Sequence, residues 1–261
     1  MLRALAFTLL VLLSGCAGVL PGGAEKDRAA VRTLGVLPLL VDEGSAIGHP
    51  ERQGVVDLLY RHNVLKESRL TALLKERRKF FDIRPISGDP ARLYARLVRE
   101  RALAGEGPGQ TWQYRFNPSA AAELAREGAA EALLVIVFNG IDRKEKRWDR
   151  TRLNFLEGEF NALLATAMVV LPSGEVVWES SGAPGKAFAL LQYPDFDEAF
   201  YNLTDQVQVK FVTLAGLERA LAEPERGVFA RSPFPRRYGK LFEEIASELK
   251  PDRLVPQGGV R

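Results

Sequence analysis

The sequence predicts an α/β fold, in which a mixed β-sheet of about five strands is covered by helices and followed by a C-terminal β-hairpin and a long helix. Two apolar runs, at residues 33–41 and 132–138, have the length of strands and lack polar alternation, which is typical of strands buried on both faces. Between them, apolar residues recur at helical spacing over residues 52–79. Strands that alternate with helices in this way indicate a sheet with helices packed on it.

Helices and loops connect the strands in the first half of the chain. Residues 42–50 contain several Gly and Pro residues and are expected to form a loop, which one or two amphipathic helices follow over 52–79. A short strand is predicted over 80–86. Two further helices are predicted to begin after Asp89 and Asn117, because each is a capping residue before a proline, which is favoured in the first helical turn.

A hairpin is predicted in the second half. Residues 155–171 and 175–181 have the pattern of two strands, and Pro172-Ser173-Gly174 between them suits a tight turn. Simple alternation places Val176 and Trp178 on one face of the second strand. The charged stretch 142–152 that precedes the hairpin is predicted to be the exposed part of a strand or of a longer hairpin.

The longest helix is predicted over about residues 196–222, with Asp195 as its N-cap. An apolar stripe on this helix is expected to cover the sheet, and it comprises Phe196, Phe200, Leu203, Val207, Phe211, Leu214 and Leu221. Residues 223–261 are then a tail that lies on the domain or is free of it, with a short helix near 241–249. The single α/β domain is accordingly expected to span residues 33–222.

The composition excludes several classes of protein. With 46% hydrophobic and 26% charged residues, the chain of 261 residues can bury a sizeable core. The formal net charge is +3 and charges of both signs are interspersed, so no nucleic-acid partner is expected, because such a partner needs basic residues gathered on one face. One cysteine and two histidines argue against a zinc site, which usually takes three or four such ligands. No metal and no dissociable cofactor is expected.

The chain lacks the motifs of common catalytic sites, so we do not expect an enzyme. Gly105–Gly109 lacks the preceding strand and the following lysine of a phosphate-binding loop, and it indicates a flexible loop. His49 and His62 are interpreted as surface residues. The carboxylates within residues 195–198 could be imagined as an acid–base pair. Their position at a predicted helix start explains them without catalysis, because negative charge there complements the helix dipole.

The densest run of charge supplies a candidate interaction surface, which comprises Arg143, Lys144, Lys146 and Arg147. A run of this kind contacts anionic lipid headgroups, contacts a partner protein, or is simply a solvated loop. The sequence leaves these three interpretations open.

The N-terminus indicates a secretory signal, because an uncharged apolar stretch of about ten residues is shorter than the roughly 20 residues of a spanning helix. Leu13-Ser14-Gly15-Cys16 ends this stretch and resembles the lipobox of bacterial lipoproteins. The resemblance implies that residues 1–15 are removed, that a lipid is attached to Cys16, and that residues 16–32 form a tether. The absence of Asp at position 17 implies the periplasmic face of the outer membrane. An ordinary signal peptide, or a buried N-terminal helix, is the alternative.

Two further segments carry a second resemblance. The segments Glu-Gly-Ala-Ala-Glu-Ala-Leu-Leu-Val at 127–135 and Met-Val-Val-Leu-Pro-Ser-Gly-Glu-Val-Val-Trp at 168–178 resemble envelope lipoproteins related to the curli-secretion protein CsgG and the N-terminal domain of TolB. The similarity covers about residues 33–221. The chain departs from the pattern at Ala130-Glu131, where Ala-Asp is usual, and at Leu171–Ser173. The resemblance implies protein–protein contacts in the envelope and no active site.

These observations together predict a non-catalytic scaffold, assembly or accessory factor, which the covalent lipid on Cys16 attaches to the outer membrane and which contacts envelope proteins. The alternative is a component of an envelope transport or secretion system, either a ligand-binding accessory or a pore subunit.

Overall fold

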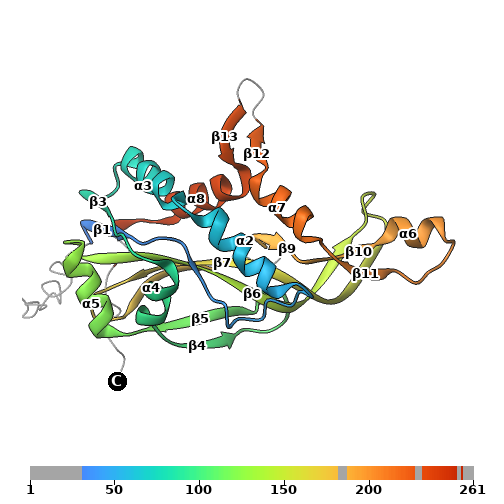
Figure 1. The fold of residues 1–261 in the computed structure, drawn as a ribbon, viewed down its shortest axis with the longest axis horizontal. Helices are drawn as coiled ribbons and strands as arrows, with labels where there is room; N and C mark the ends of the chain where they lie inside the picture. The colour runs from blue at the N-terminus through green and yellow to red at the C-terminus, as the bar shows by residue number, and fades with distance from the viewer. Residues whose placement is uncertain (1–30, 182–186, 227–230, 252–253, 255–261) are drawn as a thin grey trace, which may run out of the picture.

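The computed structural model describes residues 31–181, 187–226, 231–251 and 254, so Cys16 and the signal sequence lie outside the described residues. The centre of the fold is a mixed sheet of seven strands, five of which run in the order β3-β1-β6-β7-β8 (Figure 1). Short strands β2 and β9 pair with β6 and β7. The predicted fold class is confirmed, and the sheet has two more strands than expected.

The first apolar run forms two strands, β1 (Thr33–Val36) and β2 (Leu40–Val41), on either side of Pro38. Both pair in parallel with β6 (Ala132–Trp148), and β1 also pairs in parallel with β3 (Asp82–Pro85). Leu34 packs into the core on one face of the sheet and Leu40 into the core on the other. The strands are therefore buried on both faces, as the unbroken apolar runs predicted.

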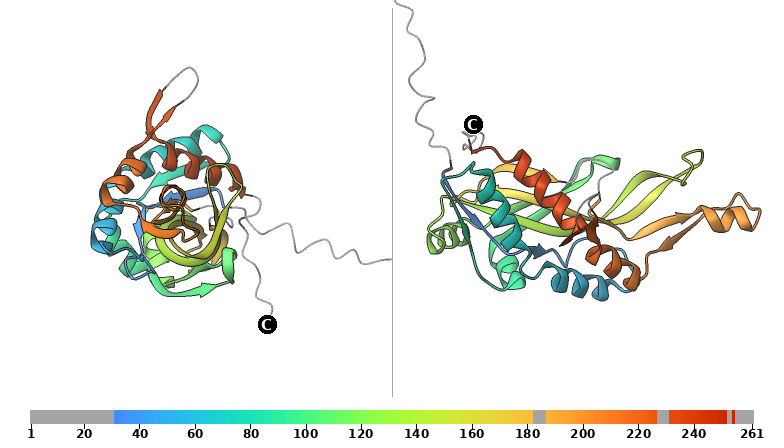
Figure 2. Two further views of the ribbon diagram at one scale, coloured as in Figure 1. Left: turned by 90° about the vertical axis from the view of Figure 1, so that its right-hand side faces the viewer. Right: turned by 90° about the horizontal axis from the view of Figure 1, so that it is seen from above.

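Helices cover the first face of the sheet and, with it, form the main core (Figure 2). These helices are α2 (Arg52–Asn63), α3 (Lys66–Arg77), α7 (Leu214–Ala222) and α8 (Arg236–Glu248). The aromatic side chains of Phe138, Phe188 and Tyr238 meet in this core, with ring centroids 4.7–6.0 Å apart.

The opposite face carries a second core under two helices and a two-stranded hairpin. These elements are α4 (Pro90–Leu97), α5 (Pro118–Glu127), β4 (Val98–Ala104) and β5 (Thr111–Phe116), and a 3₁₀ turn at Gly107–Gly109 joins the two strands. The Asp89 carboxylate accepts the Arg92 amide at 2.9 Å. The Asn117 side chain accepts the Ser119 amide at 3.1 Å. Both predicted helix starts are therefore confirmed.

Strands β6 and β7 (Phe155–Val170) form an antiparallel hairpin whose register runs without a break from Leu133↔Val170 to Trp148↔Phe155. Its far half projects beyond the body of the protein (Figure 1). The turn from β7 to β8 (Val176–Ser181) is the predicted one, because the Gly174 amide donates to the Leu171 carbonyl at 2.9 Å and Gly174 has φ +80°. A bulge at residue 177 breaks the alternation of β8, so Val176 packs in the second core whereas Trp178 packs against the main core.

The prediction of one long helix over 196–222 is wrong. The structure has a helix α6 (Phe196–Tyr201), a strand β11 (Gln208–Phe211) that pairs with β10 (Gln192–Asp195), and then α7. Leu203 adopts a left-handed backbone (φ 49°) just after α6, and the Thr213 hydroxyl caps α7 by accepting the Gly216 amide at 3.1 Å. We call residues 192–211 the arm.

The C-terminal segment is not a tail on the surface, because it supplies a central part of the main core. Strands β12 (Pro224–Arg226) and β13 (Arg231–Pro235) lead into α8. Tyr238, Phe242 and Ile245 of this helix are at most 1% exposed. The domain therefore extends past residue 222. Within the described ranges, no helix is both long enough and apolar enough to cross a membrane.

Candidate interaction surface

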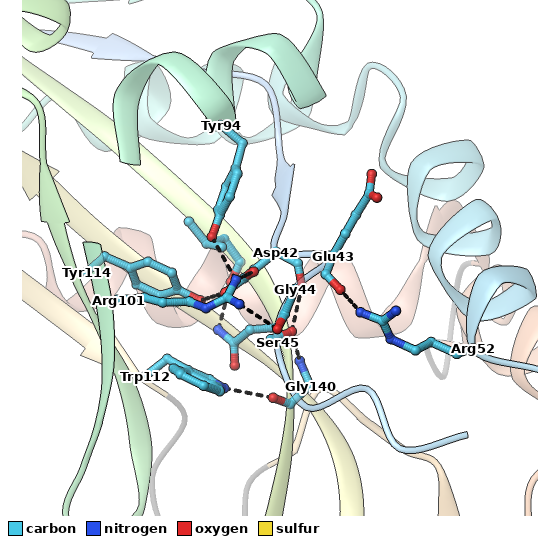
Figure 3. Close-up of polar contacts among 12 residues, drawn as sticks. Asp42, Glu43, Gly44, Ser45, Arg52, Tyr94, Arg101, Trp112, Tyr114 and Gly140 are labelled. Atoms are coloured by element: carbon cyan, nitrogen blue, oxygen red, sulfur yellow. Dashed lines mark hydrogen bonds and ion pairs between the residues drawn. The ribbon is translucent and has the colours of Figure 1, made fainter. Parts of the chain in front are cut away.

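A buried polar network lies where β2 ends, and Figure 3 shows its members. Asp42 follows β2 directly and its side chain is fully buried. One carboxylate oxygen accepts the Tyr114 hydroxyl at 3.1 Å, and the other accepts a guanidinium N–H of Arg101. Arg101 also donates to the Gly44 carbonyl at 2.5 Å. The network thus attaches the β4–β5 hairpin to the loop after β2.

The chemistry of this network is structural. Burial, together with the nearby charge of Asp42, raises the pKa of the Tyr94 and Tyr114 hydroxyls above the ordinary value, so both phenols stay neutral at physiological pH. Both carboxylate oxygens of Asp42 accept hydrogen bonds within the network. The indole N–H of Trp112 donates to the Gly140 carbonyl at 2.8 Å and adds a second attachment of the hairpin to β6.

The four basic residues chosen from the sequence do not form one exposed surface. They lie on β6, where successive side chains point to opposite faces. Lys144 and Lys146 are exposed and lie 3.5 and 3.6 Å from the Glu157 carboxylate. The Arg143 side chain is 0% exposed and that of Arg147 is 14% exposed. The sequence could not distinguish the exposed lysines from the buried arginines, because a run of charged residues looks the same whether it forms a loop or a strand.

The two histidines have ordinary packing roles. His49 is partly buried, with Nε2 2.8 Å from the Val212 carbonyl and its ring edge-on to Phe211. Burial lowers the pKa of His62. The Asp195 carboxylate caps α6 by accepting the Glu198 amide at 2.9 Å, and this amide, together with Lys210, lowers the Asp195 pKa. Among the described residues, no three His, Cys, Asp or Glu side chains are grouped so as to hold a metal ion.

Large apolar side chains are exposed at the end of the molecule where the β6–β7 hairpin and the arm both project (Figures 1 and 2). At the hairpin these are Trp148, Leu153 and Phe155, and on the arm they are Phe200, Tyr201 and Leu203. Leu153 is 80% exposed, Phe200 73% and Leu203 93%. We call these six side chains the distal apolar surface. Exposed apolar side chains that gather in this way are typical of binding surfaces.

A groove separates the two halves of this surface. It encloses about 560 Å³ between the hairpin turn and the arm, and Phe155, Phe196, Phe200 and Val207 supply its apolar walls. Arg150 of the turn lies 3.6 Å from Asp197 of the arm and links the two halves. The groove is therefore a concave site of mixed apolar and polar lining between two segments that are distant in sequence.

The turn that forms one wall is held by its own hydrogen bonds. The Asp149 carboxylate accepts the Leu153 amide at 3.1 Å, the Thr151 hydroxyl at 2.8 Å and the Asn154 side-chain amide at 3.2 Å. On the arm, Lys210 pairs with Asp195 at 3.0 Å and with Glu198 at 2.7 Å. Both walls are thus fixed locally before any partner binds, which reduces the entropy lost on binding.

Sequence reasoning missed this surface, because Phe200 and Leu203 fit a helical stripe that was expected to be core. One signal could have revealed it. Residues 204–213 are rich in Thr, Val and polar residues, a composition that favours a turn and a strand over the continuation of a helix.

Comparisons with known proteins find similarity among solved structures. No protein-family model matches the chain, and no curated protein is similar to it in sequence. Among solved structures, the chain is similar to a neuraminyllactose-binding hemagglutinin homolog from Helicobacter pylori, with a TM-score of 0.38 and 10% sequence identity over 90% of this chain and 94% of that one.

Proposed function

We propose that this protein is a non-catalytic accessory or scaffold protein of the bacterial envelope, which binds a partner protein through the distal apolar surface. The observation that carries the proposal is the exposure of large apolar side chains on both walls of one groove. Burial of each such side chain by a partner contributes roughly 1.5–3 kcal/mol before the costs of association. The expected partner therefore presents apolar side chains that fit between the hairpin turn and the arm.

The charges of the arm favour a protein over an anionic membrane as its partner. The arm carries Asp195, Asp197, Glu198 and Asp205 against Lys210 alone. These carboxylates would be repelled by anionic headgroups, whereas a protein can match them with its own cations.

The envelope location is proposed from the N-terminal sequence. Leu13–Cys16 resembles a lipobox, and the segments 127–135 and 168–178 resemble those of envelope lipoproteins that act through protein contacts. A lipid on Cys16 would hold the protein at the periplasmic face of the outer membrane.

Site-specific photocrosslinking tests the proposal. A photoreactive phenylalanine analogue at position 200 should give a discrete crosslinked product in intact cells of the native host, and the second change Leu203→Asp should abolish it. Phe81 is the matched control, because it is 79% exposed but precedes β3 at the other end of the molecule. Products of equal yield from positions 200 and 81, or no product from position 200, would contradict the proposal.

A further inference from the structure

We propose that the inner face of the projecting β6–β7 hairpin binds a small oxyanion, a carboxylate or a phosphate group, between the guanidinium groups of Arg143 and Arg147. This site is separate from the distal apolar surface. It is defined by Arg143, Glu145 and Arg147 of β6 and by Gly158 and Phe160 of β7, which face one another across the hairpin.

The first observation is an incomplete set of hydrogen bonds. Arg143 is 2% exposed, and its Nε donates to one Glu145 oxygen at 2.5 Å. Both of its Nη atoms are buried and have no hydrogen-bond acceptor among the residues that the structure describes. Nη2 of Arg147 lies 2.6 Å from the other Glu145 oxygen, while its Nε also has no acceptor. The two arginines therefore have unused donors inside the protein.

The second observation is an excess of positive charge. Over residues 141–147 and 156–162, Glu145 is the one carboxylate on this face of the two strands. The other acidic side chains, Asp142, Glu157 and Glu159, lie on the opposite face, because successive residues of a strand alternate between faces. A guanidinium stays protonated even when buried, so one negative charge is shared by two positive charges. An uncompensated buried cation is strongly unfavourable, and a bound anion would neutralise it.

The third observation is room for a ligand. Gly158 lies directly opposite Glu145, and a Cβ atom built at Gly158 meets only Cε2 of Phe160, at 3.9 Å. Arg147 is the outer member of the pair and lies over the Phe160 ring, with its guanidinium carbon 5.2 Å from the centroid. The space opposite Glu145 therefore takes at least a methyl group, and a small anion would enter from the side of Arg147, whose side chain is the more exposed of the two.

The donor geometry favours oxyanions over halides. The two Nη groups of an arginine form a planar fork that matches two oxygens of a carboxylate or a phosphate. A spherical chloride ion cannot accept such a parallel pair of hydrogen bonds equally well. The proposed site should consequently distinguish acetate and phosphate from chloride at the same ionic strength.

Thermal melts of the full-length protein test the site with sodium acetate, sodium phosphate and sodium chloride at matched ionic strength. For the wild type, acetate or phosphate should raise the melting temperature with the logarithm of its concentration above Kd, by roughly 5–11 °C at 100 times Kd, whereas chloride should not. The oxyanion whose effect begins at the lower concentration is the preferred group. A wild-type melt that is insensitive to both oxyanions, or equally sensitive to chloride, would overturn the proposal.

Three variants locate the effect. Arg143→Met should lose the oxyanion response, while Lys144→Met, which removes the same charge from the exposed face of the same strand, should keep it. Gly158→Leu keeps every charge but fills the space opposite Glu145, so it should also lose the response even if Arg143→Met folds poorly. Responses equal to that of the wild type in Arg143→Met and Gly158→Leu would show that the site is elsewhere and that the proposal is wrong.

Discussion

At the scale of single residues, the buried carboxylate of Asp42 connects the end of β2 to both strands of the β4–β5 hairpin. It follows β2, accepts from Tyr114 of β5 and pairs with Arg101 of β4, so one buried side chain fixes the position of a whole hairpin. Removal of one partner from such a buried pair typically costs 3–5 kcal/mol, because the remaining group is left without compensation. The network therefore explains why a hairpin with a largely exposed first strand stays on the sheet.

The tyrosines of this network give a prediction about pH. The pKa of Tyr114 is raised in the folded state by burial and by Asp42, whereas in the unfolded chain it is near 10. Below pH 10 the hydroxyl is protonated in both states and its contribution to stability is fully present. Above pH 10 only the unfolded chain loses the proton, so stability should fall by about 1.4 kcal/mol per pH unit for this residue.

Urea denaturation between about pH 9 and 11.5 measures this dependence, with Tyr114→Phe as the comparison. The variant should be less stable at neutral pH, because Asp42 loses a donor, but its stability should fall less steeply above pH 10. The difference between the two slopes isolates Tyr114 from other groups that titrate in this range. Identical slopes for the two proteins would show that Tyr114 ionises in the folded state.

The basic run 143–147 shows what sequence could not decide at this scale. Residue types predicted the exposed part of a strand or of a long hairpin, and the structure has a hairpin whose residues are only partly exposed. They could not predict that Arg143 is buried and Lys144 exposed, because this depends on the strand register and on what covers each face. Side-chain direction in a charged segment is fixed by tertiary contacts rather than by composition.

At the scale of elements, secondary structure was predicted correctly from the sequence where one local signal dominates. The unbroken apolar runs gave β1, β2 and β6, and the capped prolines gave the starts of α4 and α5. The β4–β5 hairpin was missed because Val98–Ala104 carries charges and alanines that favour a helix. Its strand form depends on the attachment to Asp42 and Gly140, which no local pattern shows.

The burial of the arm and of α8 is the reverse of what their hydrophobic periodicity predicted. The apolar stripe of 196–211 was expected in the core and is largely exposed, while the expected tail supplies α8 to the main core. Hydrophobic spacing indicates that one face of an element packs against another apolar surface. It does not indicate whether that surface belongs to the same chain or to a partner.

This difference in burial predicts effects of different size on stability for two phenylalanines. Phe242 of α8 is 1% exposed, so Phe242→Ala should lower the free energy of unfolding by about 3–5 kcal/mol. Phe200 of α6 is 73% exposed, so Phe200→Ala should change it by about 0.5 kcal/mol or less. Chemical denaturation of both variants measures the contrast, and similar losses for the two would contradict the placement of the arm.

At the scale of the whole molecule, β1, where the described chain begins, and the projecting ends of the β6–β7 hairpin and the arm lie at opposite ends of an elongated fold (Figures 1 and 2). Residue 31, where the described chain begins, leads into β1 at the end away from the hairpin turn and the arm. A lipid on Cys16 would therefore attach the protein through the end opposite the groove. Anchoring and partner binding should then be separable by mutation.

The last prediction tests this separation. Cys16→Ala should leave an unprocessed precursor that takes up no labelled palmitate, because the thiol that receives the lipid is gone. Tyr201→Ser together with Leu203→Ser, with the photoreactive residue kept at position 200, should be processed, labelled and retained in the outer membrane like the protein without these two changes, yet lose the crosslinked partner, because both residues are exposed on the arm. Palmitate labelling, membrane fractionation and crosslinking of the three proteins measure each property independently. A Cys16→Ala protein that is still processed and labelled would refute the lipid anchor, and distal variants that lose membrane retention would show that the two ends do not act separately.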